Sequence, residues 1–165
     1  MDEAFYAEGL RFSCQRCSSC CRGGPGYVFL AKDDLRRLLA RFGLDLAAFI
    51  EKYCVLVDTG LGFAISLAEK PNFDCVLLGE NGACEAYEAR PVQCSTYPFW
   101  ASLLDSEEDW EAEGKDCPGI GKGELRSKEH IEECLWRRRA AGTILLSRAE
   151  AAHPEKLDAD TLLGR

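Results

Sequence analysis

The stretch CQRCSSCC, from Cys14 to Cys21, places four thiols within eight residues. A C-x2-C turn brings two thiolates to one ion while the backbone amides between them point at the sulfurs, as in zinc knuckles and iron–sulfur loops. Cys14 with Cys17, and Cys17 with Cys20, both have this spacing. Cys21 does not readily join them, because adjacent side chains point to opposite sides of a strand or about 100° apart around a helix. The adjacent pair therefore predicts a second metal site.

A second site needs ligands from elsewhere in the chain, and four further cysteines lie on predicted turns, strand ends or loops. These are Cys75, Cys84, Cys94 and Cys117. Ferredoxin-like spacing completes C-x2-C-x2-C with a remote cysteine followed by proline, and Cys117 is followed by Pro118. One predicted group of ligands is therefore Cys14, Cys17, Cys20 and Cys117. The other is Cys21, Cys75, Cys84 and Cys94.

The two remaining cysteines have the surroundings of buried apolar residues. Cys54 follows the apolar face that contains Phe49 and Ile50. Cys134 follows Ile131 at helical spacing. Because a free cysteine packs as a small hydrophobe, we expect neither Cys54 nor Cys134 to bind metal.

The meaning of these thiols depends on the compartment, because disulfides persist in oxidising surroundings and are rare in the cytosol. The segment MDEAFYAEGLRF carries acidic residues where a secretory signal has positive charge and an apolar run, and no segment approaches a membrane span. A chain of 165 residues that is 47% hydrophobic also buries a core without disulfide staples. We therefore expect a cytoplasmic protein without membrane contact that uses its cysteines for metal. A disulfide framework and a thiol–disulfide oxidoreductase, which needs only one exposed C-x2-C, are the disfavoured alternatives.

The net charge of −8 disfavours binding to nucleic acid or to anionic membranes, which attract excess Lys and Arg. Arg137, Arg138 and Arg139 are a local exception, which we interpret as a solvated helix surface. Eight thiolates around two divalent ions leave net negative charge, so cations near the ligands are expected to stabilise the sites. Cations within five residues of a predicted ligand include Arg16, Arg22, Arg90, Lys115 and Lys122.

The elements that must position these ligands begin with two helices. An apolar stripe at i, i+3, i+4 and i+7 predicts an amphipathic helix that ends at Gly43. The stripe consists of Leu35, Leu38, Leu39 and Phe42. Asp45 is the predicted cap of a second helix that continues to Tyr53.

Short hairpins are predicted in the middle of the chain. Val55–Val57 and Phe63–Leu67 flank the turn sequence DTGLG. The dipeptide Asn81-Gly82 predicts a second turn between Leu77 and Cys84. Phe99–Leu104 is a further predicted strand.

The C-terminal part is predicted to be helical. Ser127 precedes a helical pattern through Ile131, Leu135, Ile144 and Leu145, with Gly142 as a possible break, and the tail from Pro154 is expected to be loose or a short helix. The predicted fold is a small single α+β domain with helices flanking short antiparallel hairpins and with the metal sites on loops. Residues 1–126 form its predicted cysteine-cluster part, and residues 127–165 form a C-terminal helical segment packed on the same domain.

At FSCQRCSSCCRG and CVLLGENGACEAYEARPVQCSTYPFW the chain resembles the YkgJ-type CxxCxxCC family, described as zinc- or iron-chelating and also found in flagellin lysine methylases. The resemblance runs from Phe12 to Gly119 and includes the signature R-P-x-x-C-x-x-Y-P-F that starts at Arg90. The family's eight cysteines map onto the eight residues predicted from spacing. Many members have glycine where this chain has Ser18, a change that removes no ligand. The resemblance implies metal binding and no settled reaction.

Three classes of function remain open. The first is a structural or partner-supporting metal protein, as all-thiolate zinc sites usually are. The second is an iron–sulfur protein that transfers electrons or serves as the accessory subunit of an enzyme. The third is metal handling or storage. Spacing does not separate zinc from iron, because thiolate suits both. No catalytic residue is assigned, since His130 and His153 have the setting of surface residues, and whether the chain is an enzyme stays open.

Overall fold

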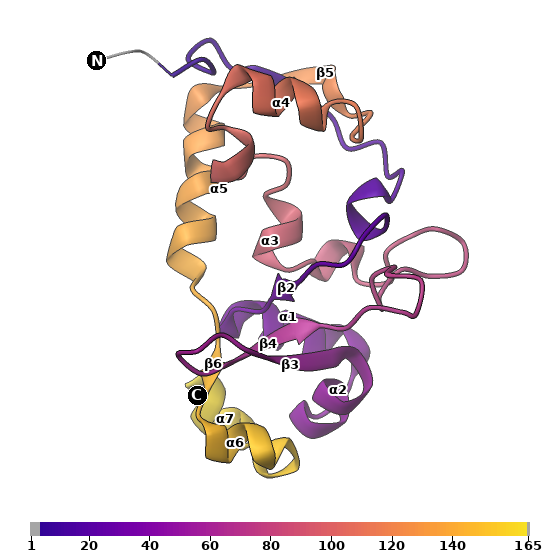
Figure 1. Cartoon of the computed structure of the whole chain (residues 1–165), viewed down its shortest axis with the longest axis vertical. Helices are drawn as coiled ribbons and strands as arrows, with labels where there is room; N and C mark the ends of the chain where they lie inside the picture. The colour runs from indigo at the N-terminus through magenta and orange to yellow at the C-terminus, as the bar shows by residue number, and fades with distance from the viewer. Residues whose placement is uncertain (1–3, 165) are drawn as a thin grey trace.

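Two separate groups of buried apolar side chains organise the chain in the computed structural model, which describes residues 4–164. One lies in the sheet lobe, residues 28–89 and 144–164, and the other in the ribbon lobe, residues 4–13 and 97–141. Figure 1 shows the lobes at opposite ends of an elongated molecule, with residues 14–27 and 90–96 between them. The chain is a small single domain of the predicted α+β class. The acidic start at residues 1–3 and the last residue, 165, lie outside the described residues.

The first two helices of the sheet lobe follow from short sequence signals, namely an apolar stripe and capping residues. α1 (Lys32–Phe42) buries Leu35, Leu38 and Leu39, and ends at Gly43, whose φ of 63° favours glycine and whose amide donates to the carbonyl of Leu39. α2 (Leu46–Tyr53) starts at Asp45, whose carboxylate accepts a 2.8 Å hydrogen bond from the amide of Ala48. Both predicted helices are confirmed.

The sheet of this lobe is antiparallel. It contains β2 (Val28–Phe29), β3 (Cys54–Asp58), β4 (Phe63–Leu67) and β6 (Leu145–Leu146). β4 pairs with each of the other three strands, and the predicted β3–β4 hairpin has Cys54 opposite Leu67. After α6 (Arg148–Ala152), the tail from Pro154 contains a short helix, the second of its two predicted forms. This is α7 (Ala159–Leu163), which brings Leu163 into the core at 1% exposure.

The ribbon lobe contains a strand pair that was not predicted. β1 (Leu10–Phe12) pairs antiparallel with β5 (Ile120–Arg126), so that Leu10 lies opposite Arg126. Behind this ribbon lie α4 (Glu107–Glu113) and α5 (Lys128–Ala141), whose buried side chains pack with those of Phe12 and Phe99. No helix within residues 4–164 is both long and apolar enough to cross a membrane.

Three local predictions for the rest of the chain need correction. Phe99–Leu104 is not a strand, because the amide of Leu103 donates back to the carbonyl of Trp100 and closes a 3-10 turn at Ala101–Leu103. The Asn81-Gly82 turn is present, but only Leu78 and Cys84 pair across it, so no hairpin strands form. The last predicted helix starts after Ser127 and ends at Gly142, beyond which Ile144 and Leu145 extend toward and into β6.

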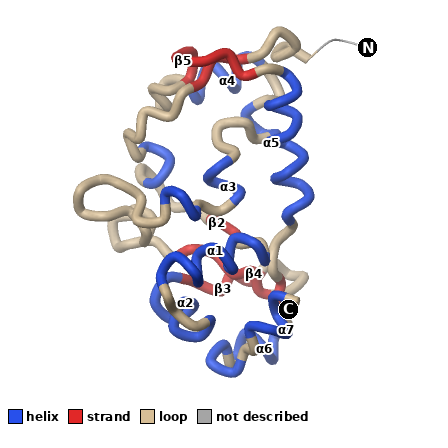
Figure 2. Tube along the Cα trace, turned by 180° about the vertical axis from the view of Figure 1, so that it is seen from behind, coloured by secondary structure: helices blue, strands red, loops and turns tan. Residues whose placement is uncertain are grey.

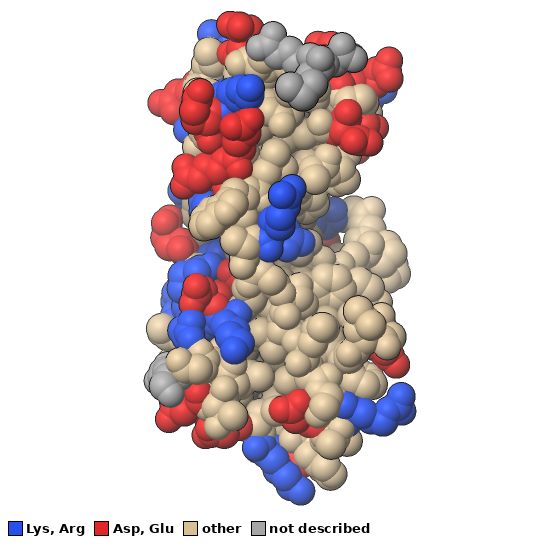
Figure 3. Space-filling view, turned by 90° about the vertical axis from the view of Figure 1, so that its left-hand side faces the viewer, with Lys and Arg blue, Asp and Glu red and all other residues tan. Residues whose placement is uncertain are grey.

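Much of the chain between the lobes is therefore loop, as the tan segments of Figure 2 show. Figure 3 shows acidic side chains gathered over the end that holds the ribbon lobe and basic side chains near the middle of the same face. Arg137 and Arg139 are exposed, as predicted for a solvated helix surface. Arg138 is half-buried and donates to the side chain of Gln93 at 2.9 Å.

The ribbon also approaches the cysteine loop closely, and this contact gives a test of the fold. A Cβ added at Gly119 would lie 2.4 Å from the carbonyl oxygen of Ser13, so Gly119→Ala should push the loop that begins at Cys14 away from β5. We expect a loss of about 1–3 kcal/mol in the free energy of unfolding, the usual cost of overpacking. Urea denaturation of the variant measures this loss. Gly24→Ala is the matched control because a Cβ there meets nothing within 4 Å, and an equal loss in both variants would contradict the contact.

Candidate metal centre

Five thiols from four segments converge between the two lobes. Cys20 and Cys21 lie in the 3-10 turn Ser19–Cys21, and the carbonyl of Cys21 accepts a 2.8 Å hydrogen bond from the amide of Cys75. Cys84 and Cys94 lie close enough to Cys20 and Cys75 for their charges to act on one another. We call these five residues the inner thiol group.

The turn that carries the vicinal pair is made by a left-handed residue. Ser18 has φ 60° and ψ 10°, and its carbonyl accepts a hydrogen bond from the amide of Cys21. The sulfur atoms of Cys20 and Cys21 then lie 3.9 Å apart. This is closer than strand or helix geometry led us to expect, because the tight turn rotates the two side chains toward each other. The division of the ligands into two groups of four stays a prediction.

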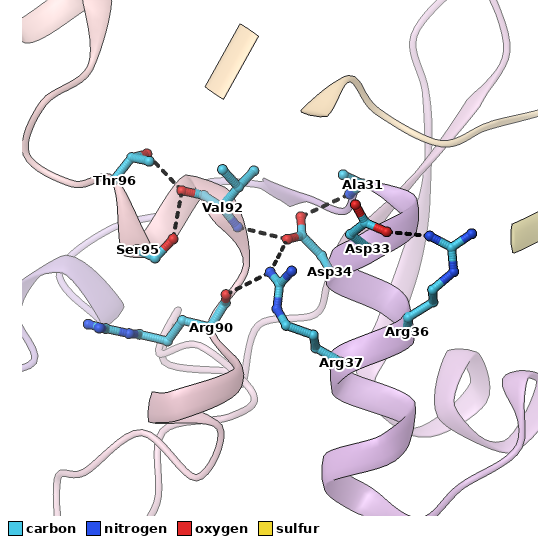
Figure 4. Close-up of polar contacts among 9 residues, drawn as sticks. All are labelled: Ala31, Asp33, Asp34, Arg36, Arg37, Arg90, Val92, Ser95 and Thr96. Atoms are coloured by element: carbon cyan, nitrogen blue, oxygen red, sulfur yellow. Dashed lines mark hydrogen bonds and ion pairs between the residues drawn. The ribbon is translucent and has the colours of Figure 1, made fainter. Parts of the chain in front are cut away.

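Cys94 is positioned by a buried carboxylate far from it in the sequence. It lies on α3 (Val92–Ser95), whose first amide, that of Val92, donates to Asp34 at 2.8 Å. Asp34 is 1% exposed and also accepts from the amide of Ala31 and from Arg37. Figure 4 shows how this carboxylate joins the start of α1 to the start of α3. The sheet lobe therefore determines where Cys94 lies.

Burial and mutual hydrogen bonding perturb the inner thiols. With Cys21 as donor, the sulfur–sulfur hydrogen bond stabilises the Cys20 thiolate and lowers the pKa of Cys20 to about 7. The same bond, together with burial, raises the pKa of Cys21. Burial is the main cause of the raised pKa of Cys75 and Cys84, and it raises the pKa of Cys94 to about 12. Four of the five thiols thus keep their protons at neutral pH, and a metal ion must displace these protons to bind.

The other three predicted ligands lie outside the inner thiol group. Cys14 and Cys17 are exposed on the N-terminal loop, and the thiol of Cys17 bonds to the hydroxyl of Ser19 at 3.4 Å. Cys117 is buried in the core of the ribbon lobe. Its thiol bonds with the hydroxyl of Tyr97, which donates to the carboxylate of Glu113, and burial followed by these two contacts raises the pKa of Tyr97.

The two cysteines expected not to bind metal lie in other surroundings. Cys54 begins β3 and packs against the core of the sheet lobe, where burial raises its pKa to about 12. Cys134 is 4% exposed on α5, and its sulfur lies 3.8 Å from Nε2 of His130. The prediction that both pack as apolar side chains fits these positions.

An open pocket of about 230 Å³ lies beside the inner thiol group. Cys20, Cys21, Cys75 and Cys94 line one part of it, and the rings of Tyr97 and Trp100 line another. A small ion therefore has a path from solvent to four of the thiols.

The cations expected near the ligands differ in their positions. The guanidinium carbon of Arg90 lies 3.6 Å from the centre of the Tyr87 ring, and that of Arg16 lies 4.0 Å from the same centre. Arg22, Lys115 and Lys122 are exposed. Lys70, which sequence reasoning missed, partly offsets the raised pKa of Cys75 and donates to the carbonyl of Leu78.

The donor set fits a zinc or iron ion in its chemistry, because all five inner donors are sulfur and thiolate suits both metals. As the side chains stand, no three His, Cys, Asp or Glu residues within 4–164 are arranged to hold a metal ion. Backbone and side-chain hydrogen bonds, such as those of Cys75 to Cys21 and of Val92 to Asp34, position the four segments. Metal binding therefore requires the sulfur atoms to move closer to a common point.

A comparison with protein-family models identifies a family that contains this chain. Residues 13–118, well over half of the chain, match the family described as "CxxCxxCC: Putative zinc- or iron-chelating domain". The chain belongs to the CxxCxxCC family. This match confirms the resemblance inferred from the cysteine spacing, and it covers all eight predicted ligands of this CxxCxxCC protein. No solved structure matches the chain significantly.

Proposed function

We propose that this CxxCxxCC protein holds zinc or iron through about eight thiolates, and that the bound metal ties its two lobes together and supports a surface for a protein partner or an enzyme. The observation that carries the proposal is the convergence of the inner thiol group from four segments at the junction of the lobes. A closed all-thiolate site is typical of structural metal, which cross-links segments that are distant in the sequence.

The proposed ligands are those predicted from spacing. Cys21 would bind one ion with Cys75, Cys84 and Cys94. Cys20 would join Cys14, Cys17 and Cys117 in a second site. Cys20 and Cys117 both lie near Glu113, which supports this second group. The charge of Glu113 acts on Cys20, and its carboxylate accepts from the hydroxyl of Tyr97, which also bonds with the thiol of Cys117.

The second candidate function is an iron–sulfur protein that transfers electrons or assists an enzyme. Cys117 favours it, because this ligand is buried in the ribbon lobe and is followed by proline, as in ferredoxin-like sequences. Such a cluster, when bound, would supply one-electron chemistry.

Metal and sulfide analysis of protein purified without oxygen separates these functions. Colourless protein with stoichiometric zinc supports the structural role. Visible absorption with acid-labile sulfide supports the iron–sulfur role. Protein that is folded, retains reduced thiols and binds neither zinc nor iron when these are supplied would contradict both.

Removing the metal should loosen the loop of residues 68–90 more than the packed cores of the two lobes. We expect faster proteolysis in residues 68–90 after chelation, because the thiols of Cys75 and Cys84 then lose their cross-link. Helical circular dichroism should largely persist, since α1 and α5 have apolar cores of their own. Limited proteolysis with mapping of the cut sites measures the change. Unchanged cleavage in verified apoprotein would contradict the structural role.

We also propose a cytoplasmic location. All ten cysteines are free thiols, which supports a reducing compartment. Fractionation of the cells that produce the protein tests this proposal.

A further inference from the structure

One aromatic ring links the exposed cysteine loop to the inner thiol group. Tyr87 has the guanidinium of Arg90 at 3.6 Å and that of Arg16 at 4.0 Å from its ring centre. Arg16 lies between Cys14 and Cys17 on the loop, and the amide of Tyr87 donates to the carbonyl of Cys84. The ring of Tyr87 therefore fixes the position of two cations among the predicted ligands.

Arg90 is held at both of its ends. Its carbonyl accepts a 3.2 Å hydrogen bond from Arg37, which is itself paired with Asp34. Figure 4 shows the side chain of Arg90 extending away from α1, in the direction opposite to this carbonyl. Stacking on Tyr87 then holds the guanidinium plane. An arginine held in this way loses little further conformational freedom when it forms a hydrogen bond.

The Nε of Arg90 nevertheless has no hydrogen-bond partner. Among the buried side-chain nitrogen and oxygen atoms of residues 4–164, it is the one that lacks such a partner. Leaving a buried donor unpaired is costly, so such a group in a folded protein calls for a partner or a role, such as a water, an ion or a site that it serves.

The positive charge of Arg90 acts on three thiols of the inner thiol group. Arg90 lies between Cys84 and Cys94 in the sequence, and its positive charge acts on Cys20 as well as on these two residues. A thiolate bound to metal accepts hydrogen bonds from nearby N–H donors, and such bonds orient the ligand and reduce its charge.

We propose that Arg90 is a positioning residue of the metal centre, whose Nε–H donates to a metal-bound thiolate of the inner thiol group, with Tyr87 holding the guanidinium in place. This inference rests on the proposed metal binding. It assigns to one donor a role that charge alone, supplied by any nearby cation, would not perform.

The experiment uses the full-length protein with Arg90→Gln, Arg90→Lys and Tyr87→Leu. Zinc affinity is measured by competition with a chelator, and the centre is observed through the sulfur-to-metal absorption of the Co²⁺-substituted protein. We expect each variant to lose roughly 10- to 100-fold in zinc affinity, the usual effect of removing a partner of a metal ligand. The absorption should move to longer wavelength, because a thiolate without its donor gives up electrons more easily.

Arg41→Gln is the matched control. It removes the same charge and a stacked guanidinium, whose carbon lies 5.7 Å from the ring centre of Phe42, on an exposed part of the sheet lobe. We expect this variant to bind zinc and absorb like the parent protein.

The three variants distinguish a specific hydrogen bond from general charge. Full recovery by Arg90→Lys would overturn the proposal, because lysine keeps the charge and lacks the planar donor. Unchanged affinity and absorption in Arg90→Gln would also overturn it. If the parent protein binds neither Zn²⁺ nor Co²⁺, the proposed function itself fails, a result distinct from a parent that binds both and a variant that matches it.

Discussion

Replacing Cys94 with serine should remove a large part of the bound metal, and Cys20→Ser and Cys21→Ser should have the same effect. A serine hydroxyl does not ionise at neutral pH, so each variant loses one anionic sulfur donor. Because the proposed metal would contribute to folding, the soluble yield should also fall. Metal content per chain, measured by atomic emission after purification without oxygen, tests this expectation.

Cys54→Ala and Cys134→Ala are the matched controls for these three substitutions. Both remove a thiol from a packed environment outside the inner thiol group. They should keep the full metal content and lose only packing energy, about 1 kcal/mol or somewhat more. Loss of metal in Cys54→Ala, together with full metal in Cys21→Ser, would show that the eight-ligand assignment is wrong.

Asp34→Ala should strongly destabilise the fold. The carboxylate is buried and accepts hydrogen bonds from the amides of Ala31 and Val92 and from the side chain of Arg37. Its removal leaves two backbone donors unpaired, which corresponds to about 3 kcal/mol in the free energy of unfolding. Urea denaturation measures this loss, and metal content should fall because α3 no longer has a fixed start.

Asp33→Ala provides the comparison for Asp34→Ala. Asp33 pairs with Arg36 at the same i, i+3 spacing as Asp34 with Arg37, but it is exposed, so its loss should cost at most about 1 kcal/mol. Figure 4 shows the two pairs side by side at the start of α1. Equal losses in both variants would mean that Asp34 does not join the two helices.

The parts of the fold that follow from neighbouring residues were predictable. The apolar stripe ending at Gly43 and the cap at Asp45 determine α1 and α2, and the turn sequence between Val57 and Phe63 determines the β3–β4 hairpin. In each of these elements the hydrogen bonds that stabilise the structure join residues close together in the chain. Local signals are therefore sufficient.

The elements that depend on distant partners were missed or misassigned. Three of the seven residues of β5, IGKGELR, are glycine or lysine, and the strand is mostly exposed. Neither alternation nor apolar content therefore marks this segment as a strand, and it becomes one because β1 pairs with it. Phe99–Leu104 has the apolar content of a strand, but no strand lies beside it and its amides bond within the segment.

The candidate site shows the same division. Cysteine spacing was sufficient to predict the family that the chain belongs to, and the assignment of the eight ligands stays a prediction. It did not show that Asp34 caps α3, or that Tyr87 lies against both Arg16 and Arg90, since these contacts join segments that only the folded chain brings together.

The pairing of β1 with β5 has a consequence for the newly made chain. The side chain of Arg126 donates to the carbonyl of Phe12 across 114 positions, so β1 has no partner strand until most of the polypeptide has left the ribosome. The thiols of Cys14 to Cys21 follow β1 directly and emerge long before Cys94 and Cys117. During synthesis these first four sulfurs therefore emerge without the later ligands, and a site completed by Cys117 forms only after the C-terminal third of the chain has begun to emerge.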